Sequence, residues 1–194
     1  MLEELVDKYL KTESLYRDRL NKYKKTTNLN ELLEYALPGA DPDGEYQFDP
    51  HQYRISNKEE IYRRIIDTIL SNPNIVSSLN NPEKFEDVFD VFSNIRKAKL
   101  APGFGPLSVY DVSLRVAVSR GVFPEVVYLH AGALKGAKQL LADDFKGKKN
   151  KYKDNRDHIY IHHHCFPLEV QKLEAFQIED FLCNYKDFFK KPIR

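Results

Sequence analysis

The sequence predicts a mainly helical protein, an orthogonal multi-helix bundle with little or no sheet. Apolar residues recur every three or four positions over most of the chain, as they do along one face of a helix. Proline and glycine stand at the ends of these periodic stretches, where helices start and stop. With 194 residues and no internal repeat, the chain is long enough for one sizeable core. We therefore expect a single helical domain over residues 1–194.

The first 40 residues are expected to form a helical arm packed on that domain. Leucine and tyrosine recur at helical spacing among charged residues and predict a long amphipathic helix: Leu2, Leu5, Tyr9, Leu10, Tyr16, Leu20 and Tyr23. A short helix is expected over 28–37. The stretch 38–55, rich in proline, glycine and aspartate, is expected to be a loop. The charged side of the long helix is a candidate surface for a protein partner.

The core of the domain is placed at residues 56–145 and begins with three successive helices. A capping-box pattern starts at Ser56, before the first of them. Pro82 lies near the start of the second helix, Pro106 lies near the start of the third, and Gly121 marks its end. The second helix carries an apolar stripe made of Phe85, Val88, Phe89, Phe92 and Ile95.

After the third helix the pattern changes. The β-branched and aromatic residues of 122–132 predict an extended segment, and a helix is expected over 133–145. The lysine-rich stretch 146–157 predicts a basic loop. The stretch 158–166 alternates like a strand, and we interpret it as an extended crossing segment; one or two helices follow over 167–191.

Composition limits the classes of function. The chain has 30 basic and 29 acidic residues, so a phosphate-binding surface must be a local patch. Two cysteines, Cys165 and Cys183, are too few for a disulfide scaffold and are expected to be free thiols. The chain begins with no secretion leader and has no membrane-spanning apolar run. These features predict a soluble, cytoplasmic protein that does not contact membranes.

The stretch KLAPGFGPLSVYDVSLRVA, residues 99–117, carries the main functional signal. Glycine at positions 103 and 105 allows backbone conformations with positive φ and leaves room for a phosphate to approach. The helix that follows adds the N–H groups and the positive dipole end of its N-terminus. Phe104, between the glycines, is expected to be buried against the helix pair. A tip of this kind binds a sugar–phosphate backbone without reading bases.

The run Leu-Ala-Pro-Gly-Phe-Gly-Pro-Leu-Ser resembles the helix-hairpin-helix motif of DNA repair and recombination proteins over about 20 residues. The resemblance implies sequence-independent binding of nucleic acid, with duplex DNA as the expected partner. The candidate nucleic-acid contacts are Lys97, Lys99, Gly103, Phe104, Gly105, Ser108, His130, Lys135 and Lys138. The alternative is a turn without a ligand, in a structural or partner-binding helical protein.

The order of elements is also similar to that of helix-hairpin-helix DNA glycosylases. In that family a helix and an extended stretch with a catalytic aspartate follow the hairpin, and bifunctional members carry a lysine two residues after the second glycine. Here Leu107 stands at the lysine position, and the extended stretch offers Tyr128 and His130 but no aspartate. We therefore expect binding without catalysis, with a diverged glycosylase as an alternative.

Two further stretches allow more than one interpretation. The small residues of 131–137 permit close approach either by a neighbouring helix, which we favour, or by phosphates, with Lys135 and Lys138 as contacts. The five residues His158, His162, His163, His164 and Cys165 lack the spacing of a zinc site, and we expect no metal and no cofactor. Arg156 and His162 also resemble the catalytic pair of HEPN-type ribonucleases, which is a second enzyme alternative.

Overall fold

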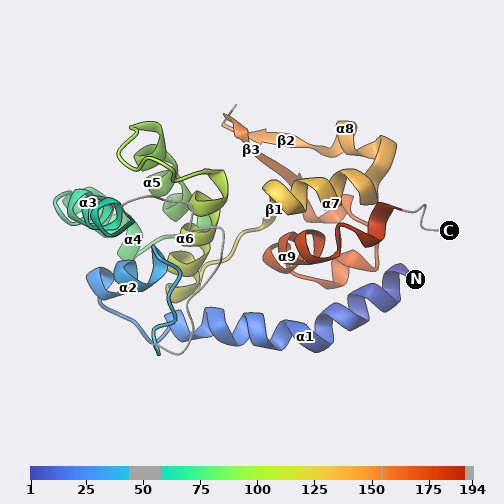
Figure 1. Ribbon diagram of the computed structural model, residues 1–194, viewed down its shortest axis with the longest axis horizontal. Helices are drawn as coiled ribbons and strands as arrows, with labels where there is room; N and C mark the ends of the chain where they lie inside the picture. Colours follow the sequence, from blue (N-terminus) through green and yellow to red (C-terminus); the bar gives the residue numbers. More distant parts are fainter. Residues whose placement is uncertain (44–57, 154, 191–194) are drawn as a thin grey trace. The chain divides into compact units, whose positions relative to one another are not determined.

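The computed structural model describes residues 1–43, 58–153 and 155–190 (Figure 1). Most of them are helical, as expected, and a small three-stranded sheet is also present. The chain groups into two compact units. We call Tyr16–Phe123 the helical unit, and Met1–Leu15 together with Pro124–Arg194 the mixed unit. The single-domain organisation and its boundaries stay predictions, and the capping box at Ser56 lies outside the described residues.

The helical unit contains the end of α1 (Leu2–Tyr23) and five further helices: α2 (Leu29–Ala36), α3 (Lys58–Leu70), α4 (Pro73–Asn80), α5 (Phe85–Lys97) and α6 (Pro106–Ser119). Helix α4 was not predicted as a separate helix from the sequence. It starts where the Asn72 side chain accepts hydrogen bonds from the backbone N–H groups of Asn74 and Ile75, with Pro73 in its first turn. The proline ends the preceding helical pattern and begins a new one.

The core of the helical unit forms around α5 and α6. Every residue of the predicted α5 stripe is buried, and so are most residues of α6 from Val109 to Val118. The buried guanidinium of Arg115 donates a hydrogen bond to the carbonyl of Ala36, at the end of α2, over 2.9 Å. Arg120, just after α6, donates to the carbonyls of Leu79 and Thr27. The two arginines satisfy carbonyls at helix ends and in a loop, which fixes α6 against its neighbours.

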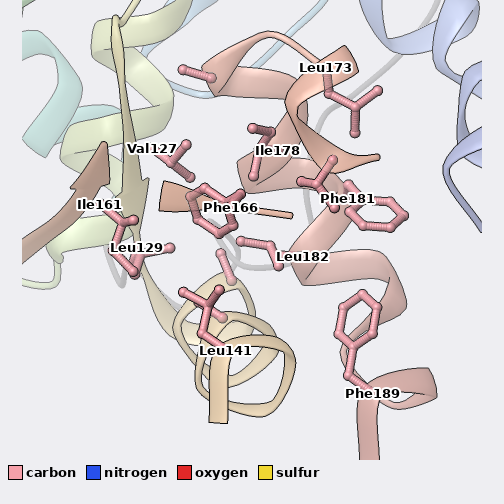
Figure 2. Close-up of a cluster of buried hydrophobic side chains, with 14 of the residues drawn as sticks. Val127, Leu129, Leu141, Ile161, Phe166, Leu173, Ile178, Phe181, Leu182 and Phe189 are labelled. Atoms are coloured by element: carbon pink, nitrogen blue, oxygen red, sulfur yellow. The ribbon is translucent and has the colours of Figure 1, made fainter. Parts of the chain in front are cut away.

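The mixed unit contains the start of α1, the sheet and the C-terminal helices. Its elements after β1 (Val126–Leu129) are α7 (Ala131–Leu141), η2 (Ala142–Asp144), α8 (Phe145–Lys148), β2 (Asn150–Tyr152), β3 (Asn155–His162), η3 (His163–Cys165), η4 (Val170–Lys172), α9 (Ala175–Tyr185) and η5 (Phe188–Lys190). The strands are antiparallel in the order β1-β3-β2, with Val127 opposite Ile161. Figure 2 shows Val127, Leu129 and Ile161 in one cluster with Phe166, Leu182 and other residues of the C-terminal segments.

The sheet occupies stretches for which the sequence predicted a loop and a crossing segment. Residues 150–152 of the expected basic loop form β2, and residues 155–162 form β3, paired with both other strands. Along β2, Lys151 is exposed while Tyr152 is half-buried with its ring 6.0 Å from that of Tyr128. The lysines of an edge strand make its sequence look like a loop, because only alternate side chains are covered.

None of the helices within the described ranges combines the length and the apolar character that a membrane-spanning helix needs.

Candidate nucleic-acid interface

The α5–α6 turn, residues 98–105, begins with a tight helix end. After the C-cap residue Ala98, the N–H of Lys99 donates to the carbonyl of Arg96 (3.0 Å) and the N–H of Leu100 donates to that of Ile95 (3.4 Å). This is the hydrogen-bond pattern of a Schellman motif, whose left-handed position is usually glycine. Here Lys99 takes that position, with φ +56°. A lysine in this conformation costs about 1 kcal/mol relative to the right-handed region.

A second reversal follows directly. The N–H of Phe104 donates to the carbonyl of Ala101 over 3.0 Å, which closes a four-residue turn. Pro102 and Gly103 hold its central positions, and the φ of +84° at Gly103 is that of a type II turn, which requires glycine there. The Phe104 side chain is only 3% exposed, as the sequence predicted. It anchors the turn to the core and does not present its ring to a ligand.

Helix α6 starts directly after this turn, and we call residues 103–108 the tip. Gly105 is its N-cap, with φ −82° and ψ 178°, and its carbonyl accepts from the N–H of Val109 over 3.0 Å. Pro106 has no N–H, and the N–H groups of Leu107 and Ser108 lie in the first turn, before any helical acceptor. Within the described residues, no acceptor is found for the N–H groups of Gly103, Gly105, Leu107 or Ser108. Four backbone donors therefore lie on one short tip.

The surroundings of the tip suit an anion. Residues 95–109 contain three cations, Arg96, Lys97 and Lys99, and no carboxylate. Lys97 and Lys99 are exposed, while Gly105 is half-buried, and an ideal Cβ built on Gly105 meets no atom within 4 Å. The open space, the donors and the positive end of the α6 dipole together form a surface that a phosphate oxygen can reach.

The remaining predicted contacts, His130, Lys135 and Lys138, lie on the mixed unit. His130 is 4% exposed, and burial lowers its pKa to about 3, with the nearby His158 adding to the effect. It is therefore uncharged at neutral pH and cannot offer a cation to a phosphate. Lys135 is exposed and forms an ion pair with Asp187 (3.4 Å). Lys138 is exposed, with its ammonium 6.0 Å from the centre of the Phe145 ring.

The glycines of α7 have a packing role. An ideal Cβ on Gly132 would lie 2.5 Å from the Sγ of Cys183, and one on Gly136 would overlap the carbonyl oxygen of Leu182. Both contacts are with α9, and the contact at Gly136 is with backbone that has no freedom to move aside. The small residues of this stretch thus allow α7 and α9 to approach closely, as favoured from the sequence.

The residues of the two enzyme alternatives lie on α6, β1 and β3 or just after β1. Leu107 lies in the first turn of α6. Tyr128 and His130, which the extended stretch offers in place of the glycosylase aspartate, are both buried. His162 is exposed at the end of β3, and the Arg156 side chain lies outside the described residues. Over the described ranges, no three His, Cys, Asp or Glu side chains come together as metal ligands.

One contributor to the tip has no side-chain signal in the sequence. The Leu107 backbone N–H joins those of Gly103, Gly105 and Ser108, although a leucine side chain carries no polar signal. The signal that was available is Pro106, because a proline at the first helical position leaves the N–H groups of the next two residues without helical acceptors. Side-chain chemistry alone does not find a site built from backbone.

The close contact between α7 and α9 predicts that two glycine substitutions, one inside it and one outside it, change stability by different amounts. Gly136→Ala should destabilise the protein by about 2 kcal/mol, because the new methyl group meets the Leu182 backbone. Gly147→Ala, in α8, meets nothing within 4 Å and should be neutral or stabilise by about 0.5 kcal/mol. Urea denaturation of both variants measures the difference, and equal effects would contradict close packing at Gly136.

The burial of His130 predicts acid sensitivity. Its pKa is about 3 in the folded protein and 6.5 without the fold, so below pH 6.5 the unfolded chain binds a proton that the folded chain does not. Stability contributed by neutral His130 is thus present above pH 6.5 and decreases as the pH falls towards 3. Between pH 7 and pH 5 the loss is about 2 kcal/mol. His130→Phe should lose less stability over this interval in urea denaturation; an identical loss would refute the assignment.

Comparison with known proteins gives no assignment. No protein-family model matches the chain, and neither a curated protein nor a solved structure is similar to it. The function proposed below therefore rests on the geometry of the chain itself.

Proposed function

We propose that the protein binds the backbone of nucleic acid, with duplex DNA as the expected ligand, and that it does so without reading sequence and without catalysis. The α5–α6 turn acts in this proposal as a helix-hairpin-helix. The observation that carries it is the set of four backbone N–H groups, at Gly103, Gly105, Leu107 and Ser108, gathered on one tip without acceptors in the described structure.

The geometry of the donors supports a phosphate as ligand. Backbone N–H groups at the first turn of a helix point out of its N-terminus and cannot be neutralised, so they form a fixed anion-binding surface to which turn N–H groups can add. The absence of a Cβ at Gly105 leaves the approach open. Contacts of this kind position a nucleic-acid backbone and carry no base information.

The charge around the tip supports the same ligand. Lys97 and Lys99 are exposed on either side of the helix end, in a chain whose formal net charge is only +1. Lys99 holds its place in a left-handed conformation that glycine would adopt without strain. A lysine kept at such a position is accounted for when its ammonium contacts a phosphate.

The proposal excludes glycosylase chemistry of the helix-hairpin-helix kind. That chemistry needs an amine nucleophile or a catalytic carboxylate, and neither Leu107 nor the buried Tyr128 and His130 supply one. The positions that would carry the chemistry hold side chains that pack.

The sharpest test adds a side chain at Gly105. Its φ of −82° suits any residue and its Cβ has free space, so Gly105→Val should fold, with a loss of about 0.5 to 1 kcal/mol because valine is a poorer N-cap than glycine. The isopropyl group would occupy the space through which a phosphate approaches, so affinity for a labelled DNA duplex at low salt should fall by about tenfold or more. Fluorescence anisotropy measures the binding, with Lys11→Gln on α1 as a control in exposed charge. Undiminished binding by the folded Gly105→Val variant would overturn the proposed role of the tip.

Lys99→Gly separates binding from stability, because the two should change in opposite directions. Removing the left-handed lysine should stabilise the helical unit by about 1 kcal/mol. Removing the ammonium should weaken duplex binding and lower the slope of log affinity against log salt by about 1. Denaturation and anisotropy at several salt concentrations measure the two quantities. An unchanged salt slope would show that Lys99 contacts no phosphate.

A further inference from the structure

Positive charge is concentrated in one part of the mixed unit. Residues 135–153 contain seven lysines and two aspartates, which leaves 23 of the 30 basic residues and 27 of the 29 acidic residues elsewhere. The remainder of the chain is therefore net acidic. The excess of positive charge lies in the segment that runs from α7 through α8 into the edge strand β2.

Two of these lysines are already compensated. Lys135 pairs with Asp187 (3.4 Å) and Lys148 pairs with Asp144 (3.1 Å). Four others are exposed and, within the described part of the chain, no carboxylate pairs with them. We call these four the lysine ridge: Lys138, Lys146, Lys149 and Lys151.

The fold brings members of the ridge together from different elements. The ammonium groups of Lys138, on α7, and Lys149, just before β2, lie 6.0 and 5.9 Å from the centre of the same Phe145 ring. The two ammonium groups therefore lie within about 12 Å of each other. Lys151 follows two residues after Lys149, about 7 Å further along the extended chain. A nucleic-acid strand carries a charge every 3.4 Å or so along its axis, so several phosphates fit this length.

We propose that the lysine ridge is a second contact surface for the nucleic-acid backbone, on the mixed unit and separate from the α5–α6 turn. The proposal extends the proposed function, since the ligand is the same phosphodiester chain. It differs in mechanism: the turn offers fixed N–H groups, whereas the ridge offers mobile ammonium groups that displace counterions. Lysine is suited to this as a point charge on a long stem.

The ridge fits nucleic acid better than an anionic membrane surface. A membrane-surface segment interleaves its cations with exposed large apolar side chains that enter the lipid. The large hydrophobic side chains exposed in the described structure all lie outside residues 135–153, and Phe145 is 5% exposed beneath the two ammonium groups. The surface offers charge without an apolar anchor.

A purely structural role predicts a different outcome. Lysines on an edge strand such as β2 discourage pairing with another chain, and this needs no ligand. On that account, removing the charges promotes self-association and leaves nucleic-acid affinity unchanged. Binding and association are therefore measured on the same variants.

The test compares two triple variants of the full chain that change charge equally. The ridge variant is Lys138→Gln, Lys149→Gln and Lys151→Gln. The control variant changes exposed lysines outside the ridge, Lys8→Gln, Lys11→Gln and Lys25→Gln. Binding to a labelled duplex is measured by anisotropy at several salt concentrations, with melting curves to verify folding and light scattering to detect association.

We expect the ridge variant to bind at least tenfold more weakly than the control variant at moderate salt, with a salt slope lower by about 2 to 3. Equal affinity and slope in the two variants would overturn the proposal, and self-association at unchanged affinity would assign the lysines to edge protection. Loss of binding to phosphatidylserine vesicles, with duplex binding intact, would also overturn it.

The Gly105→Val variant separates this proposal from that of the turn. If Gly105→Val binds the duplex normally while the ridge variant does not, the proposed role of the ridge is supported and that of the turn is refuted. The reverse result refutes the proposed role of the ridge and supports that of the turn.

Discussion

The reversal of the chain between α5 and α6 is the constraint on which the candidate interface depends. Phe104 must reach the core within a turn of eight residues, from the C-cap of α5 at Ala98 to the N-cap of α6 at Gly105. The chain meets this requirement with two positive φ values, at Lys99 and Gly103. The Schellman bonds and the type II turn use the N–H groups of Lys99, Leu100 and Phe104. The N–H groups of Gly103, Gly105, Leu107 and Ser108 have no acceptor in the described structure, so the turn that buries one phenylalanine also leaves this set of donors.

The chain is nearly neutral overall, but two local surfaces carry exposed positive charge. The α5–α6 turn is flanked by two exposed lysines, Lys97 and Lys99, and the lysine ridge carries four lysines without an ion-pair partner in the described structure. Elsewhere cations are used within the fold: Lys22 pairs with the buried Asp41, and Lys172 pairs with Glu3. The distinction between lysines engaged in the fold and lysines left exposed identifies candidate surfaces where net charge does not.

Part of this structure could be predicted from local sequence. Pro106 and Gly121 bound α6 correctly, and the apolar spacing around Phe89 identified the buried face of α5, because helix caps and helix periodicity are encoded within a few residues. The burial of Phe104 followed from the same reasoning. These features depend on neighbours in sequence.

The features that sequence did not predict depend on distant partners or on exceptions to propensity. His130 is buried where β1 lies against β3, about thirty residues later, so its neutrality has no local signal. From sequence, the glycines of α7 are compatible with either helix packing or ligand approach. The contact between Gly136 and the Leu182 backbone, which the structure shows, assigns them to packing. Lys99 occupies a position where glycine is usual, and the neighbouring residues do not predict its left-handed conformation. Strand β2 has the composition of a loop because it is an edge.

The central claim is that backbone N–H groups of the α5–α6 turn bind phosphate. It is tested most directly by following the amide signals of the ¹⁵N-labelled full chain in NMR spectra while a short DNA duplex is added. The account predicts that the amides of Gly103, Gly105, Leu107 and Ser108 shift together, with a midpoint that rises with salt. A duplex that binds while these four amides stay unchanged would contradict it.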